Sequence, residues 1–338
     1  MGIGEVYKGR TRIEYTKTPK MATQKAAGKH EVAHLEGIWA VTFDGQDQGR
    51  LLTGSLDGTI KYWSSGNLEK AIGTTPKQRT GVTSVVASLT SDRHMAAACF
   101  QDSTIRFYNL SETGIEEVKV FDESKQTEVE DKLECGLLQA WSISLAPDGL
   151  TIAAGNHAGV VNLYSLEAGH EKIAVCETRG KLVLSTAFSP SVQNQRLACS
   201  DIDGNVYIFD VLNQQLLSKL PHHALPSRSV KFSPDGNLVY SASDDRQVCV
   251  YDTISGTIVN QFSHAGMAFS VDASQDHRHF CVGASDGTVS LWDLGMQRCE
   301  NTYHCHSDQV WGVAYDAKDS ALRRFASVGD DSLVQLYE

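Results

Sequence analysis

The feature that most restricts how this chain can fold is a unit of about forty residues that occurs seven times. Its clearest copy, Gly283–Asp293, holds a strand end, an Asp-Gly turn and an alternating strand that closes on Trp292. Glycine tolerates positive φ and aspartate bonds the nearby backbone, so this pair predicts a tight turn. The closing aromatic recurs at spacings of 45, 56, 45, 42, 41 and 45 residues, as Trp63, Tyr108, Tyr164, Phe209, Tyr251, Trp292 and Tyr337.

An acidic residue stands six positions before the closing aromatic in six of the seven units, namely Asp57, Asp102, Asp203, Asp245, Asp286 and Asp331. The third unit has Ala158 at this position. Units of roughly 40–45 residues with such turns are typical of four-stranded propeller blades. We therefore expect an all-β fold, a seven-bladed β-propeller over residues 23–338. In the first blade we expect the first strand at 38–43 and the outer strand near 68–72.

The seventh unit reaches only its third strand, which ends at Tyr337. Residues 24–32 are the one spare extended segment, so we predict that they supply the outer strand of blade seven. Closing the ring in this way removes an exposed sheet edge, a common cause of aggregation.

Two segments depart from the repeat. Residues 1–22 show no sustained period and we expect a disordered, basic leader. Residues 122–134, between blades two and three, are polar and acidic, and we expect them to form an exposed flexible loop after an outer strand near 115–121.

Charge and composition exclude several function classes. The formal net charge is −11, although residues 1–30 carry seven Lys/Arg and two Glu. The body of the propeller is therefore a poor match for a phosphate backbone, and we expect no direct nucleic-acid partner. No window resembles the roughly 18 apolar residues of a membrane span or a secretory signal. The eight cysteines show no regular pairing, which indicates a reducing cytoplasmic or nuclear location.

A second pattern lies inside the repeat. A histidine precedes the closing aromatic by 28 to 31 residues in four units, and we expect it to bond the aspartate of the turn. The same His–Asp pair recurs in several blades and no nucleophile accompanies it, so we interpret it as a structural network rather than a catalytic one. The structural residues predicted in this way are His34, Ser55, Asp57, Trp63, His223, Ser243, Asp245, Tyr251, His264, Asp286, Trp292, His306 and Asp331.

The two loops that this histidine joins lie on one face of the propeller, called the top face here. The position five residues after the histidine and the position just before the aspartate should both surround the mouth of the central channel. Among them we single out Trp39, Trp141, Leu184, Phe269, Trp311, Asp244 and Asp330 as candidate partner-binding residues. An exposed aromatic patch beside acids would suit a peptide with an apolar anchor and an arginine. The alternative is that these aromatics simply pack between blades.

No phosphate-binding loop, metalloprotease motif, nucleophile elbow or paired-carboxylate motif stands out, so we expect no enzymatic activity, no catalytic residues and no cofactor. The densest Cys/His cluster is Cys299 with His304, Cys305 and His306. Zinc requires a second spaced pair of ligands, and His306 already serves the structural network, so we expect no metal site.

With these units in place, the sequence resembles the WD-repeat propeller family. Within that family it is similar to the WD-repeat subunit of the superkiller complex, which metazoans share with the polymerase-associated factor complex. The resemblance covers about residues 30–338. It depends on the stretches 177–190, 223–245 and 308–315 and on the turn at 156–159, which has no aspartate in the acidic position.

This resemblance implies a non-enzymatic scaffold that supports exosome-mediated 3′–5′ mRNA decay and surveillance, with a second role in transcription elongation. The implied partners are a helical-repeat scaffold of the tetratricopeptide type and an RNA helicase, whose Arg-plus-aromatic segments would dock on the top face. Two alternatives remain open. One is a ubiquitin-ligase substrate receptor, although Trp292-Asp293 lacks the arginine that usually follows in such proteins. The other is a histone reader whose aromatic cage takes methyl-lysine.

Overall fold

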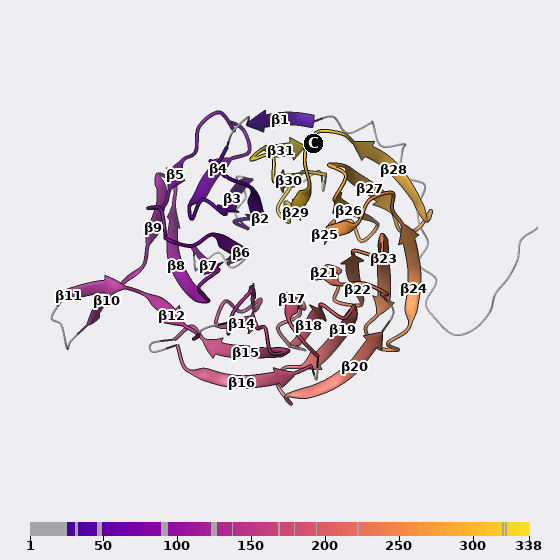
Figure 1. The fold of residues 1–338 in the computed structure, drawn as a ribbon, viewed down its shortest axis with the longest axis horizontal. Coiled ribbons are helices and arrows are strands. Elements are labelled where there is room, and N and C mark those ends of the chain that lie inside the picture. The colour runs from indigo at the N-terminus through magenta and orange to yellow at the C-terminus, as the bar shows by residue number, and fades with distance from the viewer. Residues whose placement is uncertain are drawn as a thin grey trace, which may run out of the picture.

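The computed structural model describes residues 26–30, 33–45, 49–88, 94–122, 127–136, 138–167, 170–178, 180–193, 195–221, 223–319, 321 and 323–338. Seven small antiparallel sheets are arranged in a ring around a central axis (Figure 1). The predicted seven-bladed, all-β propeller is therefore confirmed. The predicted leader, residues 1–22, lies outside the described residues. Among the described residues there is no helix long and apolar enough to cross a membrane.

Each blade is a meander whose first strand lines the channel and whose last strand forms the rim (Figure 1). Blade one holds β2 (Ile38–Phe43), β3 (Arg50–Ser55), β4 (Ile60–Ser64) and β5 (Gly73–Thr74). Blade three holds β13 (Ser142–Leu145), β14 (Thr151–Gly155), β15 (Val160–Ser165) and β16 (Lys172–Glu177). Blade four holds β17 (Val183–Phe188), β18 (Arg196–Asp201), β19 (Asn205–Asp210) and β20 (Gln215–Pro221).

Blades five to seven repeat this plan. Blade five holds β21 (Ser227–Phe232), β22 (Leu238–Ser243), β23 (Gln247–Asp252) and β24 (Ile258–Ser263). Blade six holds β25 (Ala268–Ala273), β26 (His279–Ala284), β27 (Val289–Asp293) and β28 (Arg298–Tyr303). Blade seven holds β29 (Val310–Tyr315), β30 (Phe325–Gly329), β31 (Val334–Tyr337) and, from the other end of the chain, β1 (Ala26–His30).

The ring closes as predicted. Strand β1 pairs antiparallel with β31, with Ala26 opposite Tyr337 and His30 opposite Val334. The outer strand of blade seven thus comes from residues that precede blade one, and Figure 1 shows β1 on the rim beside β31.

Blade two corrects the predicted acidic loop. Its inner strands are β6 (Val82–Ala87), β7 (Met95–Phe100) and β8 (Thr104–Ser111). Two short strands, β9 (Gly114–Glu117) and β12 (Lys132–Glu134), pair with successive parts of β8. Between them, β10 (Lys119–Asp122) and β11 (Thr127–Glu130) form a two-stranded ribbon that projects from the rim (Figure 1). The insertion therefore interrupts the outer strand of blade two rather than following it as a loop.

The predicted position of the outer strand of blade one is also wrong. We expected it near 68–72, but β5 covers only Gly73–Thr74 and pairs with β4 at Lys61 and Tyr62. Leu68, at the start of the predicted strand, is buried in the cluster that contains Trp63 and packs between blades seven and one. Leu68, which suggested a strand, therefore lies in the turn before β5 and belongs to the hydrophobic core between blades seven and one.

Serine hydroxyls join neighbouring blades near the channel. A serine in the first strand of one blade accepts a hydrogen bond from a backbone N–H in the first strand of the next, as Ser185 does from Val230 at 3.2 Å. The same bond occurs at four other joints, through Ser84, Ser142, Ser229 and Ser270. At the corresponding position blade one has Ala40 and blade seven has Gly312, which carry no hydroxyl. The two joints on either side of blade one therefore lack this contact.

Candidate partner-binding surface

The candidate residues on the channel mouth stand at β-bulges. In blade one the pairing register of β2 shifts between Ile38 and Ala40, which leaves Trp39 without a partner residue on β3. The first strands of five other blades shift at the same position, leaving out Thr83, Leu184, Arg228, Phe269 and Trp311. A bulge redirects the side chain of the extra residue. It explains why the position five residues after the histidine behaves alike around the ring.

A continuous aromatic run spans four blades. It consists of Trp141 of blade three, Trp39 of blade one, Trp311 of blade seven and Phe269 of blade six. Trp141, from just before β13, meets Trp39 edge-on with ring centroids 6.3 Å apart. Trp39 lies 5.2 Å from Trp311, and Trp311 stacks on Phe269 at 4.6 Å. The three tryptophans are partly exposed, whereas Phe269 is 6% exposed and so belongs to the core. The surface available to a partner is therefore the three indoles.

The run skips blade two because that blade has the small residue Thr83 at the ring position. Its hydroxyl donates to the carbonyl oxygen of Trp141 at 2.8 Å. Trp141 can therefore reach across from blade three to Trp39 in blade one. His157 closes this end of the run, with its ring 5.5 Å from that of Trp141.

At the other end of the run stands Arg228 of blade five. Its guanidinium carbon lies 5.0 Å from the ring centre of Phe269 and 5.5 Å from that of Trp311, which are cation–π distances. The same guanidinium donates to both carboxylate oxygens of Asp244, at 2.5 and 2.8 Å. Asp244 was expected to be open to an arginine of a partner, but it already holds this one. The predicted use of Asp244 thus differs from what the structure shows.

The remaining two candidates differ in their surroundings. Asp330 accepts the indole N–H of Trp39 at 3.3 Å through Oδ1 and is partly exposed. An added Cβ at Gly37 would lie 2.4 Å from this carboxylate, so only glycine fits beside it. Leu184 is partly buried at its bulge in blade four and takes no part in the aromatic run.

The histidine of blade one is part of a buried hydrogen-bond chain. Trp63 donates its indole N–H to the hydroxyl of Thr53 at 2.9 Å, and that hydroxyl lies 2.8 Å from Nε2 of His34. Nδ1 of His34 lies 3.2 Å from Asp57. Burial would raise the pKa of Asp57, but hydrogen bonds from His34, Thr59 and a backbone N–H outweigh it and hold this pKa well below its usual range.

Blades five and seven have the same hydrogen bonds from the histidine to an aspartate and a hydroxyl. His223 joins Asp245 at 2.9 Å and Ser241 at 2.6 Å, and His306 joins Asp331 at 3.0 Å and Ser327 at 2.7 Å. The hydroxyl that bonds the histidine belongs to a residue on the second strand of the blade, which was not predicted from the sequence. The predicted residues Ser55 and Ser243 donate instead to backbone carbonyls of the preceding loop, including those of Gly37 and Leu225.

Blade six uses its histidine differently. Nε2 of His264 accepts the indole N–H of Trp292 at 2.9 Å and lies 3.1 Å from the hydroxyl of Ser290. Asp286 bonds instead the backbone N–H and hydroxyl of Thr288 in its own turn. Burial lowers the pKa of His264 to about 4, so the ring is neutral at physiological pH.

Comparison with known proteins identifies the family. A model of the "WD domain, G-beta repeat" family matches residues 29–64, 214–252, 256–293 and 297–338. The chain is 33% identical over 313 residues to WD repeat-containing protein SL1-17 of Schistosoma mansoni, which covers 90% of this chain and 96% of that protein. The chain belongs to the WD-repeat family.

Two further relatives agree with this assignment. WD repeat-containing protein VIP3 of Arabidopsis thaliana is 33% identical over 62% of this chain and 65% of its own length. Meiotic recombination protein rec14 of Schizosaccharomyces pombe is 26% identical over 67% of this chain and 69% of its own length. WD-repeat proteins act as interaction scaffolds. In this protein the His–Asp pairs are part of the buried hydrogen-bond network described above.

Blades three and four depart from the WD-repeat turn in a way that the sequence argument overlooked. Asn156 accepts the backbone N–H groups of Ala158 and Val160, both at 2.9 Å. Asp201, which is fully buried, accepts those of Asp203 and Asn205. The turn-forming side chain in these blades therefore stands two residues before the usual acid. A search for Asn or Asp at either position would have found it.

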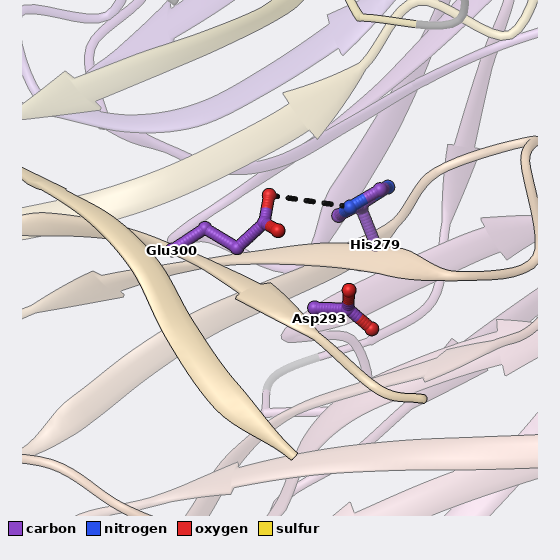
Figure 2. A group of neighbouring side chains, drawn as sticks. All are labelled: His279, Asp293 and Glu300. Atoms are coloured by element: carbon purple, nitrogen blue, oxygen red, sulfur yellow. Dashed lines mark ion pairs between the residues drawn. The ribbon is translucent and has the colours of Figure 1, made fainter. Parts of the chain in front are cut away.

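One group of side chains in this WD-repeat propeller has metal-binding spacing, within the part that the structure describes. His279, Asp293 and Glu300 of blade six point toward one another (Figure 2). However, Nδ1 of His279 bonds Asp276 and its Nε2 lies 3.3 Å from Glu300, so each ring nitrogen already faces a carboxylate. Asp293 is occupied by Arg278. The group is an ion-pair network in which carboxylates outweigh the effect of burial and raise the pKa of His279.

Proposed function

We propose that this WD-repeat propeller is a non-enzymatic scaffold that holds short segments of partner proteins on the aromatic run. One observation carries the proposal: Trp39 pairs with both Trp141 and Trp311 at the channel mouth, while all three indoles remain partly exposed. Clusters of accessible tryptophan are typical of binding hot spots, because they bury a large apolar area at little entropic cost.

The surface also indicates the chemistry of the segment. The indole N–H of Trp311 is buried and finds no acceptor among the described residues. A buried donor without an acceptor costs about 1–3 kcal/mol, and a carbonyl of a docked segment would relieve this cost only if binding turned the indole outward. An apolar side chain would pack on the indoles. An arginine of the segment would pair with Asp330, because Asp244 is engaged by Arg228.

We further propose that the assembly is the superkiller complex, with a helical-repeat scaffold protein and an RNA helicase as partners, acting in mRNA decay. A second role in the polymerase-associated factor complex would place the protein in the nucleus as well as the cytoplasm. The blade-specific stretches 177–190, 223–245 and 308–315 support this proposal. The similarity to SL1-17 over 90% of the chain supports the WD-repeat family alone.

The two alternative functions receive less support from the surface. A methyl-lysine cage needs open aromatic faces, but the guanidinium of Arg228 already lies over Phe269 and Trp311. The Trp-Asp pair of blade six continues into Leu294 and Gly295, without the arginine expected of a ubiquitin-ligase receptor.

The test is co-purification with the helical-repeat protein and the helicase of the same organism, followed by titration. The double variant Trp39→Ala/Trp311→Ala should lose the complex, and Trp311→Ala alone should weaken binding by roughly 2 kcal/mol or more, as hot-spot truncations do. Ile254→Ala is the matched control, because Ile254 is 75% exposed in a turn of the opposite face. Thermal unfolding of each variant checks that the propeller is intact.

The outcomes separate the parts of the proposal. Equal binding by wild type and the double variant would show that the aromatic run is not the docking surface. Failure of the wild type to bind either partner would reject the superkiller assignment while leaving the scaffold function to be tested with histone tails and ligase adaptors.

A further inference from the structure

Aliphatic side chains are exposed in a row along the rim of three consecutive blades, three to five. Each is between 39% and 67% exposed, and we call the row the rim stripe. Single exposed apolar residues are normal on a protein surface, whereas a contiguous group of them marks an interaction site. The rim stripe consists of Ile173 in β16, Leu212 in the turn before β20, Leu216 and Leu217 in β20, and Ile258 and Val259 in β24.

A β-bulge exposes one of these residues in each of the three blades. The pairing of β16 with β15 shifts register and leaves Ile173 without a partner residue. The same shift leaves out Leu217 in β20 and Val259 in β24. A bulge redirects the side chain of the extra residue. In blade six the extra residue is Glu300, which lies 3.3 Å from His279, so the row of aliphatic bulge residues ends there.

Neighbouring blades touch beneath the rim stripe, so its members form one surface. Ala174 of β16 packs against the core cluster that contains Val211, the residue before Leu212. An added Cβ at Gly256, in the turn before β24, would lie 3.2 Å from the hydroxyl of Ser218 in β20. Figure 1 shows β16, β20 and β24 following one another along the rim. The rim stripe therefore crosses the outer strands instead of following one of them.

This direction favours a helix as the partner. An extended segment that crosses the outer strands cannot hydrogen-bond to them as an added strand would. A helix pairs its backbone groups internally and can present a row of apolar side chains at every third or fourth residue. A second propeller is a poorer fit, because two convex rims meet at one blade and leave the rest of the stripe uncovered (Figure 1).

Few charges accompany the rim stripe. The three outer strands β16, β20 and β24 hold only three charged residues, namely Lys172, Glu177 and Lys219. In a chain of net charge −11 this surface is nearly neutral. Burial of apolar area, rather than charge attraction, would therefore hold a partner here, and salt should change its affinity little.

We propose that the rim stripe binds an amphipathic helix of a partner protein. The helix lies across β16, β20 and β24 with its apolar side against the propeller and its polar side in water. This contact is independent of the proposed function of the aromatic run, because the stripe lies on the rim and the run at the channel mouth. One propeller can therefore hold two partner segments at once.

The experiment is NMR titration of the full-length chain, labelled in its Ile, Leu and Val methyl groups. The probe is a synthetic peptide of about 18 residues, or five helical turns. It carries leucine at every third or fourth position and alanine, glutamate and lysine in between. The methyl signals of Ile173, Leu217 and Val259 should shift in a saturable way, equally at low and high salt. Leu217→Asp should weaken binding about tenfold or more.

Val192→Asp is the matched control, because Val192 is an exposed aliphatic residue of the same blade, in the turn between β17 and β18. Ile173→Asp repeats the test in blade three, and thermal unfolding of each variant checks that the propeller is intact. Binding weakened by both stripe variants but not by the control supports the proposal.

Four results would overturn it. One is the absence of saturable shifts, and another is equal binding of a peptide with the same composition but with its leucines spread around the helix. Shifts confined to Trp39 and Trp311 would place the peptide on the aromatic run. Self-association of the wild type in sedimentation, lost in Leu217→Asp, would mean that a second copy covers the stripe.

Discussion

The neutral histidine of blade six makes the stability of this propeller depend on pH between 5 and 7. Nε2 of His264 accepts the indole N–H of Trp292, so a proton on that nitrogen would set two donors against each other. Burial accordingly lowers the pKa of His264 from its ordinary 6.5 to about 4. In the unfolded chain the same ring takes up a proton near pH 6.5. Stability is therefore greatest above this value and is lost as the pH falls toward 4.

The size of the effect follows from these two pKa values. At pH 5 the unfolded chain holds the proton and the folded chain mostly does not, which costs the folded state about 2 kcal/mol. At pH 7 the cost is well below 1 kcal/mol by the same relation. His264 alone should therefore remove about 2 kcal/mol of the free energy of unfolding between pH 7 and pH 5.

The assay is urea unfolding of the wild type and of His264→Gln at both pH values. Glutamine can still accept the bond from Trp292 but does not titrate. The difference in unfolding free energy between the two proteins should shift by about 2 kcal/mol in favour of the variant at pH 5, while the contributions of other groups cancel. A difference that stays constant from pH 7 to pH 5 would refute the reasoning, because His264 would then titrate alike in both states.

Three further predictions concern stability. Ser185→Ala leaves the backbone N–H of Val230 without its acceptor at a blade joint, so thermal and urea unfolding should show a loss of about 1–3 kcal/mol. For His279, whose pKa is raised, the stabilisation is complete below the ordinary 6.5 and is lost as the pH rises through the folded value, so His279→Gln should cost more at pH 6 than at pH 9. Gly58→Ala adds a Cβ 2.4 Å from a carbonyl oxygen at φ +80° and should lower the melting temperature, whereas Gly114→Ala, with open space around it, should not.

The repeat explains how much of the fold was predictable. The closing aromatics and the Asp-Gly turns are local signals, and their spacing predicted the seven blades. The incomplete seventh unit predicted the spare strand β1. The ribbon β10–β11 was missed because its charge suggested a loop. The alternation of β-branched residues with glutamates in Thr127–Glu130 is a strand signal that the charge concealed.

The candidate surface was predictable in its positions but not in its contacts. Counting from the histidine found Trp39 and Trp311, since the first strands of six blades bulge at the same position. The pairing of Arg228 with Asp244 joins a residue of β21 to one in the turn after β22, and both residues already belonged to the predicted ring of positions. Spacing alone could not show that they would bond each other rather than a partner. That depended on the direction in which the bulge points the arginine.

The pairing of β1 with β31 also sets the order of events during synthesis. About 300 residues separate the two strands, and at roughly 5–20 residues per second the ribosome needs about 15–60 s to produce them. Throughout that time β1 has no strand to join, and the growing arc of blades presents an open sheet edge to other nascent chains. The ring can close only after Tyr337 has left the exit tunnel. A truncation that removes β31 should therefore release an aggregation-prone arc rather than a smaller propeller.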